Sequence, residues 1–330
     1  MRKLFMFAAV MAVVAMCLAA PAEAAAKKQY AFVMPNATHG FMAAAIQSAR
    51  DSLQREGAKY PDIEHRLLTS ADPSEQSNQL DTLINEKVDT IVLWPHNGDD
   101  LRSAAQKVID SGIKLVVFDR LIPDINPISE VDMDNFAYGT FLAKAVNEYF
   151  KDRLDKGEKI HILELRGDNS TASTHRVDGV MATKHANVEI VQSVVTDWQR
   201  AAGLEFMETF LTNNKKEDIE AIDAIISYDG EPTAGAYDAI LNYKGPASLA
   251  NLKLFPSLGS FADQVRLIPE MFEKVNILHS VGFVNPGCTV YGVLAGFDVV
   301  NGKEIPKQVK IGYIDVNNSN YKDFLAIMGQ

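Results

Sequence analysis

The stretch Lys114–Pro123, KLVVFDRLIP, places an apolar strand pattern directly against a charge pair. From Leu115 to Phe118 every side chain is aliphatic or aromatic, without the polar alternation of a strand that has one wet face. Such a run is typical of a strand inside a parallel sheet that is covered on both faces. Asp119 and Arg120 follow at once, and the neighbouring sequence has to explain why a core strand should end on two charges.

Strand and helix patterns alternate along the chain from residue 29 onward. Strand patterns occur at residues 29–35, 63–70, 89–95, 114–119, 159–165, 188–195, 222–228, 252–259, 276–283 and 309–316. Helix patterns occur at residues 40–56, 74–87, 99–110, 136–157, 173–185, 199–214, 231–243, 263–274 and 287–302. This alternation predicts parallel sheets with helices on both faces, and its two runs predict two similar doubly wound α/β lobes.

The first residues have the features of an export signal. Two basic residues precede an apolar run at residues 4–20, and residues 22–24 (Ala-Glu-Ala) form a small-x-small cleavage site. We expect residues 1–24 to be removed as a signal peptide, with cleavage after Ala26 as the alternative. A retained membrane anchor is the other interpretation, and the shortness of the apolar run argues against it.

Composition and charge exclude several classes of partner. The 330-residue chain has a net charge of −11, which becomes −12 when two cationic residues and one anionic residue leave with the signal peptide. An acidic protein has no broad attraction for nucleic acid or anionic lipid. Cys288 alone remains after cleavage, so no intramolecular disulfide is possible. Export without disulfides, in a chain long enough for two domains, fits a bacterial periplasm.

Charged and aromatic side chains recur just beyond the predicted strands. Ligands of open α/β sheets bind outside the carboxyl ends of the strands, so these positions are candidates for a binding site. They include His39, Phe41, Asp119, Arg120, Arg176, Trp198 and Asp229. A sugar requires this mixture, because its C–H faces stack on aromatic rings and its hydroxyls both donate and accept hydrogen bonds.

Each candidate also has a purely structural interpretation. Asp119 and Arg120 could form an ion pair that covers a strand end. Trp198 could be core, and Asp229 could be only the N-cap of the next helix. Likewise, Arg176 could be a solvated helix charge. Their shared placement at strand ends is what favours the functional interpretation.

With these residues in view, the chain resembles the periplasmic sugar-binding proteins of ABC importers, of the ribose-binding, type I class. The resemblance extends over essentially the whole exported part. It rests on segments in the expected order and at similar spacing, namely THGFMAAAIQSARDSL, VVFDR, DMDNFAYG, STASTHRVDGV, TDWQR and YDGEPTAGA. Among these, VVFDR and the last segment are the more specific.

The resemblance implies a set of ligand-binding residues. By position in the matching segments these are His39, Phe41, Met42, Asp119, Arg120, Arg176, Trp198 and Asp229. The later strands depart from the family, which usually has Gly-Phe-Asp where this chain reads PSLGSFADQ. Ser260 or Asp263 would stand in there, and Asn285 would replace a Gln near the late crossover.

The family's topology implies three crossovers between the lobes, which we expect near Met133, Val284 and Gly312. One lobe would then comprise residues 27–133 plus 285–311, and the other residues 134–284 plus 312–330. Lobes of this kind close about a three-stranded hinge on a ligand between them.

Three rival functions stay open at this point. An enzyme is disfavoured because the chain has no nucleophile elbow, no His-Glu-x-x-His and no phosphate-binding glycine loop. A transcription regulator with these lobes would need a DNA-binding helix pair in place of the export signal. A periplasmic sensor protein would present its ligand, including a non-sugar, to a chemoreceptor or sensor kinase.

The favoured interpretation is an exported, monomeric solute-binding protein of an ABC importer. We expect it to capture a monosaccharide or polyol by hinge closure and to deliver it to an inner-membrane permease. We predict no catalytic residue, no metal and no cofactor.

Overall fold

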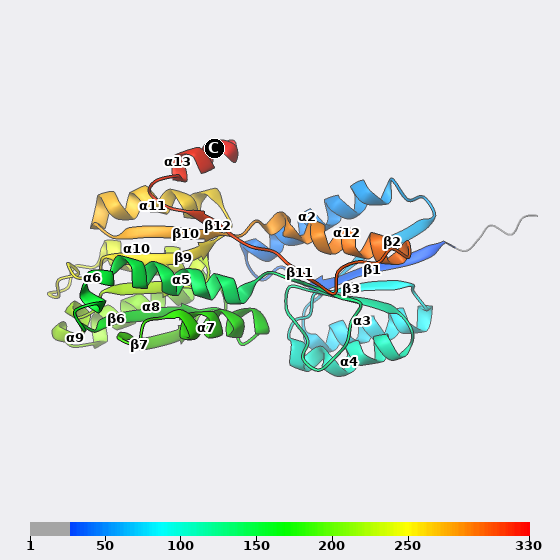
Figure 1. Ribbon diagram of the computed structural model, residues 1–330, viewed down its shortest axis with the longest axis horizontal. Coiled ribbons are helices and arrows are strands. Elements are labelled where there is room, and N and C mark those ends of the chain that lie inside the picture. The colour runs from blue at the N-terminus through cyan, green and yellow to red at the C-terminus, as the bar shows by residue number, and fades with distance from the viewer. Residues whose placement is uncertain (1–26) are drawn as a thin grey trace, which may run out of the picture.

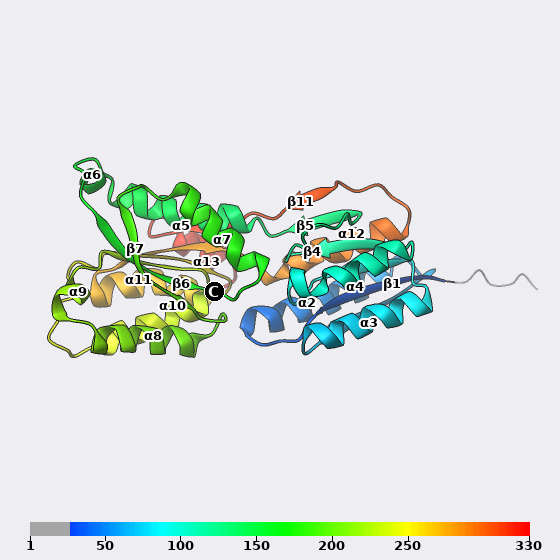
Figure 2. The same cartoon turned by 90° about the horizontal axis from the view of Figure 1, so that it is seen from below.

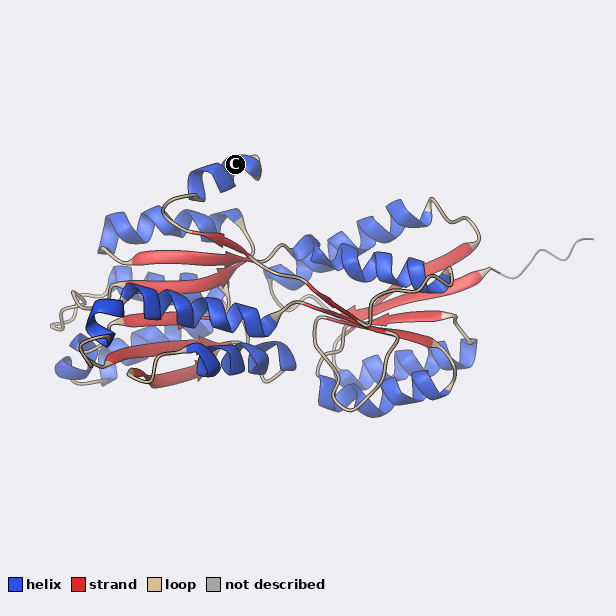
Figure 3. Cartoon of the chain, viewed as in Figure 1, coloured by secondary structure: helices blue, strands red, loops and turns tan. Residues whose placement is uncertain are grey.

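The computed structural model describes residues 27–330, which form two lobes that each contain one six-stranded sheet between layers of helices (Figure 1). The predicted signal peptide at residues 1–24 lies outside the described residues. Figure 3 shows the strands at the centre of both lobes with helices on either side. The predicted fold class, two α/β lobes with parallel sheets, is confirmed.

The sheet of the first lobe is parallel throughout, in the order β11-β5-β4-β3-β1-β2. Its strands are β1 (Lys28–Pro35), β2 (Ile63–Ser70), β3 (Thr90–Leu93), β4 (Lys114–Phe118), β5 (Ser129–Asp132) and β11 (Gln308–Lys310). The helices of this lobe are α2 (Gly40–Gly57), α3 (Pro73–Glu86), α4 (Gly98–Asp110) and α12 (Thr289–Val300).

Strand β1 shows why the strand patterns are apolar on both faces. Tyr30, Phe32 and Met34 are buried in the core that includes residues of α2 and α12. Ala31 and Val33 are buried in the opposite core, with residues of α3 and α4. Successive side chains of a strand point to opposite faces, so a sheet covered on both sides needs this continuous apolar run.

The sheet of the second lobe has the order β12-β10-β9-β8-β6-β7, parallel except for the antiparallel edge strand β12. Its strands are β6 (Ile160–Arg166), β7 (Val188–Val195), β8 (Ala224–Ser227), β9 (Leu254–Gly259), β10 (Leu278–Phe283) and β12 (Ile314–Val316). The helices are α5 (Asn135–Tyr149), α6 (Lys151–Leu154), α7 (Thr171–Thr183), α8 (Arg200–Asn213), α9 (Lys216–Glu220), α10 (Gly230–Asn242), α11 (Ala262–Val275) and α13 (Tyr321–Ile327). Figure 2 shows α5 and α7 on one side of this sheet and α8 and α10 on the other.

The chain passes between the two sheets three times. It does so between β5 and α5 at Met133, between β10 and the short 3-10 helix η1 (Pro286–Cys288), and between β11 and β12. The single strand that the sequence predicted at residues 309–316 is wrong, because β11 and β12 belong to different sheets. Residues 311–313 bridge the lobes, and there the Ile311 N–H donates to the Asp132 carbonyl (2.8 Å).

Within residues 27–330, no helix combines the length and the apolar character that a membrane span requires.

Candidate functional site

A cavity of about 50 Å³ lies between the lobes, where the carboxyl ends of the strands of both sheets face each other. Each lobe supplies residues from the segments that follow its strands. The lining residues are His39, Phe41, Met42, Trp94, Asp119, Arg120, Met133, Ala172, Arg176, Trp198, Asp229, Leu258, Ser260 and Val284. One water molecule needs roughly 10–15 Å³ of such volume. The space left between the lobes is therefore small, equivalent to a few water molecules.

Nine of the ten residues predicted as ligand-binding line this cavity. They are His39, Phe41, Met42, Asp119, Arg120, Arg176, Trp198, Asp229 and Ser260. Their role in binding stays a prediction. Asn285 does not line the cavity, because its side chain turns back and accepts a hydrogen bond from the Gly287 N–H (2.8 Å) at the start of η1. Asp263, the alternative to Ser260, is exposed in the first turn of α11.

Asp119 sits where β4 ends, in a left-handed backbone conformation with φ 60°. Aspartate tolerates this conformation better than most residues. The turn stays attached to the sheet, because the Asp119 N–H donates to the Val131 carbonyl (2.9 Å). Burial raises the pKa of the Asp119 carboxyl, and the charges of Arg120 and Arg176 oppose that rise. Asp119 is thus a buried residue that lines the cavity.

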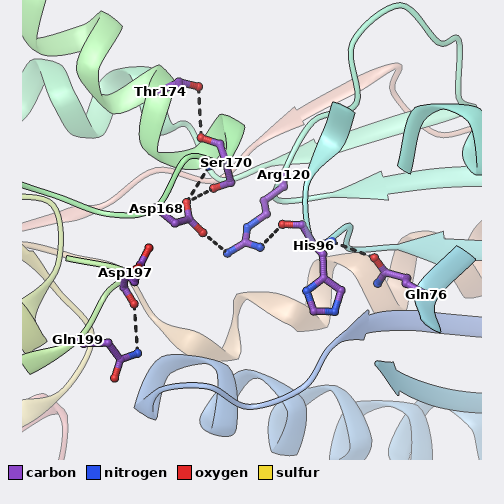
Figure 4. A network of polar contacts seen from close by, with 8 residues as sticks. All are labelled: Gln76, His96, Arg120, Asp168, Ser170, Thr174, Asp197 and Gln199. Carbon is purple, nitrogen blue, oxygen red and sulfur yellow. Dashed lines mark hydrogen bonds and ion pairs between the residues drawn. The ribbon is translucent and has the colours of Figure 1, made fainter. Parts of the chain in front are cut away.

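Arg120 is held from both lobes (Figure 4). One guanidinium nitrogen donates to the His96 carbonyl, and another lies 3.0 Å from Asp168 Oδ2. The structural ion pair between Asp119 and Arg120 that the sequence left open is not present among the described residues, since the carboxylate paired with Arg120 is Asp168. Arg120 Nε is buried and has no hydrogen-bond partner within residues 27–330.

The backbone that accepts from Arg120 is itself fixed. His96 donates its N–H to Gln76 Oε1 (2.9 Å), and the His96 ring Nε2 lies 2.9 Å from the Ser70 carbonyl. These bonds tie the segment after β3 to α3 and to the end of β2. Arg120 therefore meets the cavity from a rigid part of the first lobe.

Arg176 is a buried cation on α7, only 8% exposed. Its Nε donates to Asn135 Oδ1 (2.9 Å), and a terminal nitrogen donates to the Tyr228 carbonyl (2.5 Å). The guanidinium carbon lies 5.0 Å from the ring centre of Trp198 and 5.4 Å from that of Tyr138. The contacts with these two rings and the two hydrogen bonds fix the orientation of the guanidinium group, and therefore the directions of its remaining N–H groups.

Trp198 has an unusual backbone. Its φ is 63°, and the preceding Asp197 has φ 49°. A bulky residue in the left-handed region is an outlier, and outliers of this kind gather at binding sites. Gly167 makes room for the indole, because a β-carbon there would come within 2.0 Å of Trp198 Cη2.

Asp229 has two functions in the structure. Its Oδ1 accepts from the Glu231 N–H (2.9 Å) and caps α10, as the structural interpretation proposed, and the same carboxyl lines the cavity. Burial raises its pKa to about 6, while the bond from Glu231 and the charge of Arg176 lower it. The carboxylate is thus close to its titration point near neutral pH.

The wall contributed by α2 is aromatic. The rings of His39 and Phe41 are stacked with centroids 6.4 Å apart, and Phe41 meets Trp94 edge to face. Burial and the charge of Arg120 lower the pKa of His39 to about 4, against an opposing effect of Asp168. His39 is therefore neutral at physiological pH.

Five lining residues were missed by the sequence reasoning, namely Trp94, Met133, Ala172, Leu258 and Val284. Trp94 follows β3 in the segment IVLWP, so the strand-end rule could have found it. Its Nε1 is buried without a hydrogen-bond partner in residues 27–330. The other four are apolar, and nothing in their residue type marks them as lining a cavity.

The charges around the cavity nearly balance, with Asp119 and Asp229 against Arg120 and Arg176 and with Asp168 behind Arg120. Over residues 27–330, no group of three or more His, Cys, Asp or Glu side chains is placed to hold a metal ion. The cavity offers carboxylates, guanidinium groups and rings, a set suited to a small neutral molecule with many hydroxyls.

Comparison with known proteins agrees with the fold. The profile of the family described as "Periplasmic binding protein domain" matches residues 30–250. The chain is 27% identical over 180 residues to the D-xylose-binding periplasmic protein of Haemophilus influenzae, which covers 52% of this chain and 50% of that protein. It is 26% identical over 170 residues to the ribose import binding protein RbsB of Bacillus subtilis, covering 51% and 52%. The chain thus matches about half the length of these curated relatives.

Among solved structures, similarity extends over nearly the whole chain. An ABC transporter solute-binding protein from Bacillus halodurans, crystallised with bound myo-inositol, superposes with a TM-score of 0.75 at 19% identity. The superposition covers 92% of this chain and 99% of that one. At this identity the likeness concerns the fold.

Proposed function

Because this chain belongs to the periplasmic binding protein domain family, we propose that it captures a monosaccharide or polyol in the cavity between its lobes, as a solute-binding protein of an ABC importer. The observation that carries the proposal is the lining of the cavity. Carboxylates, guanidinium groups and stacked aromatic rings from the strand ends of both lobes meet around one small space.

The directions of the donors and acceptors support a polyhydroxylated ligand. Asp119 and Asp229 accept hydrogen bonds from ligand hydroxyls, while Arg120 Nε and the free N–H groups of Arg176 donate to hydroxyl oxygens. The rings of Phe41 and Trp198 provide faces for C–H groups. Relatives named for D-xylose and ribose, and a similar fold with bound myo-inositol, are consistent with this ligand class.

The mechanism follows from the placement of these groups. Neither lobe alone supplies the full set, so a ligand is enclosed only when both lobes meet around it. Closure would rotate the lobes about the three connections at Met133, at Val284 and at residues 311–313. The protein would reach the periplasm through its N-terminal signal peptide, and its closed form would deliver the ligand to a permease in the inner membrane. It would act as a monomer and catalyse no reaction.

Thermal melting tests this proposal. The exported part of the protein, unfolded and refolded to remove any carried-over ligand, is melted with D-xylose, D-ribose, xylitol or myo-inositol, and with small acids and amines as controls. A bound ligand raises the midpoint, since at 100 times its Kd it stabilises the fold by about 2.7 kcal/mol. We expect a shift with at least one sugar or polyol. A shift with only an acid or amine would overturn the sugar proposal.

A further inference from the structure

An ion pair joins the two lobes beside the cavity. Arg120 lies in the segment after β4 of the first lobe, and Asp168 lies in the segment after β6 of the second. Their side chains are 3.0 Å apart and only 12% and 23% exposed (Figure 4). We call this pair the interlobe latch. Arg120 lines the cavity, and Asp168 does not.

Asp168 is held in position for this contact. Its Oδ1 accepts from both the N–H (2.9 Å) and the hydroxyl of Ser170, just before α7. Oδ2 is left to face Arg120. Burial would raise the pKa of Asp168, but the charge of Arg120 and the bonds from Ser170 outweigh it, so the pKa lies below its usual range and the carboxylate stays charged.

Two further hydrogen bonds cross between the lobes. Thr171 Oγ1 donates to the carbonyl of Leu121, the residue after Arg120 (3.2 Å). Gln199 Nε2 donates to the Thr38 carbonyl (3.4 Å). These groups sit on segments that separate when the lobes rotate apart, because they lie at the cavity and not at the three connections. The latch can therefore form only in the closed form.

We propose that Asp168 is a positioning residue for ligand capture: it holds Arg120 in its binding orientation and keeps the lobes closed, so that it sets the rate of ligand release. The inference rests on the proposed function. One planar guanidinium serves both tasks, because its terminal nitrogens bind His96 and Asp168 while Nε stays without a partner. A ligand that accepts from Arg120 would therefore stiffen the group that closes the lobes.

The first test is kinetic and uses Asp168→Asn. The amide oxygen can still accept from Ser170, so the start of α7 is preserved while the charge is removed. The matched control is Asp238→Asn, which removes the carboxylate from the Arg200–Asp238 pair (2.7 Å) within the second lobe. Stopped-flow fluorescence with whichever of D-xylose, D-ribose, xylitol or myo-inositol shifts the melting midpoint gives both rate constants.

A contact that forms only after the lobes have closed should affect the dissociation rate of the ligand and not its association rate. Asp168→Asn should raise the dissociation rate about tenfold and change the association rate little, because a buried charge pair acts mainly on release. Asp168→Glu should recover part of the loss. Rate constants equal to those of Asp238→Asn would overturn the proposal.

The second test needs no ligand. Spin labels are placed on exposed positions of the two lobes through Ser103→Cys on α4 and Ala182→Cys on α7. Cys288 is buried and escapes labelling. The latch predicts a closed population, seen as a short distance between the labels, in the ligand-free protein. Asp168→Asn should reduce that population and Asp238→Asn should not.

The two tests separate the possible failures. If none of the four compounds binds the unaltered protein, the proposed function fails, and the label distances alone decide on the latch. The latch itself is overturned if the ligand-free protein shows no short distance, or if Asp168→Asn leaves the distances unchanged. Faster release with unchanged distances also overturns it, because Asp168 would then act on the ligand and not on closure.

Discussion

The indole ring of Trp198 lies against the backbone of Gly167, so close that a β-carbon on Gly167 would come within 2.0 Å of Cη2. On this support Trp198 adopts a left-handed φ of 63° and stacks on the buried guanidinium of Arg176, 5.0 Å away. One wall of the cavity thus depends on the absence of a side chain at Gly167.

Gly167→Ala should therefore weaken sugar or polyol binding at least tenfold, because the added methyl group displaces the indole. It should also lower the melting temperature of the ligand-free protein. Calorimetric titration and thermal melting measure the two effects. A double-mutant cycle with Trp198→Phe supplies the control. The smaller ring leaves room for the methyl group, so Gly167→Ala should reduce affinity and melting temperature less in the Trp198→Phe background. Equal losses of affinity and melting temperature in both backgrounds would show that Gly167→Ala does not act through the indole of Trp198.

Asp119→Asn should weaken binding at least tenfold with little change in the melting temperature of the ligand-free protein. The amide keeps the shape of the side chain and tolerates the left-handed φ of 60°, but it replaces one acceptor by a donor. Asp124→Asn is a matched control, because Asp124 has the same φ but is exposed on the first lobe. Affinity equal to that of the control would remove Asp119 from the site.

Asp132 predicts a pH dependence of stability. It is buried at the end of β5, its Oδ1 has no hydrogen-bond partner within residues 27–330, and burial together with the charge of Asp119 raises its pKa to about 7. The folded state therefore holds a proton that the unfolded state releases near pH 4. The protonated Asp132 contributes its full share to the free energy of unfolding below pH 4, and this contribution is lost as the pH rises to about 7.

Asp132→Asn should remove this loss. The stability of the variant relative to the unaltered protein should rise between pH 4 and pH 7 and level off above, by at most about 4 kcal/mol. Urea unfolding at a series of pH values measures the difference, with Asp238→Asn as the surface control. A difference that does not vary with pH would show that Asp132 ionises normally in the fold.

Asp229 predicts a pH dependence of binding, separate from its structural role. With a pKa of about 6, Asp229 is ionised at pH 7.5 and accepts hydrogen bonds from ligand hydroxyls. As the pH falls, the carboxylate becomes protonated and loses that capacity. Affinity should drop by about tenfold between pH 7.5 and pH 5. Asp229→Asn should bind more weakly at pH 7.5 and show a flatter profile.

The capping role of Asp229 is tested by the same variants. Asparagine caps helices as well as aspartate does, so Asp229→Asn should keep the melting temperature, while Asp229→Ala should lose about 1 kcal/mol of stability. If both variants bind as the unaltered protein does, Asp229 is only the cap of α10.

Much of the cavity could be predicted from the sequence, for a physical reason. Parallel strands place their carboxyl ends at one edge of a sheet, so residues far apart in sequence, such as Phe41 and Asp119, are brought together by the fold class alone. Asn285 shows the limit of this rule. It also follows a strand, but a local hydrogen bond to Gly287 turns its side chain away from the cavity.

Other features depend on tertiary structure that no local pattern reveals. The charge beside Arg120 in the sequence is Asp119, yet its partner in the fold is Asp168, which lies 48 residues later. Similarly, residues 309–316 have the composition of one strand, and only the position of the two sheets divides them into β11 and β12. The choice of ion-pair partner therefore requires the folded structure. The local pattern of residues 309–316 likewise does not show the crossing that the family resemblance implied near Gly312.

The return of the chain to its first lobe also governs how the protein can be made. Helix α12 places Val293, Phe297 and Val300 in the same core as Tyr30 and Phe32. A nascent chain that has not yet been synthesised past α12 lacks this layer, so its amino-terminal half cannot complete its folding on the ribosome. The first lobe therefore completes its core only after nearly the whole polypeptide has been made.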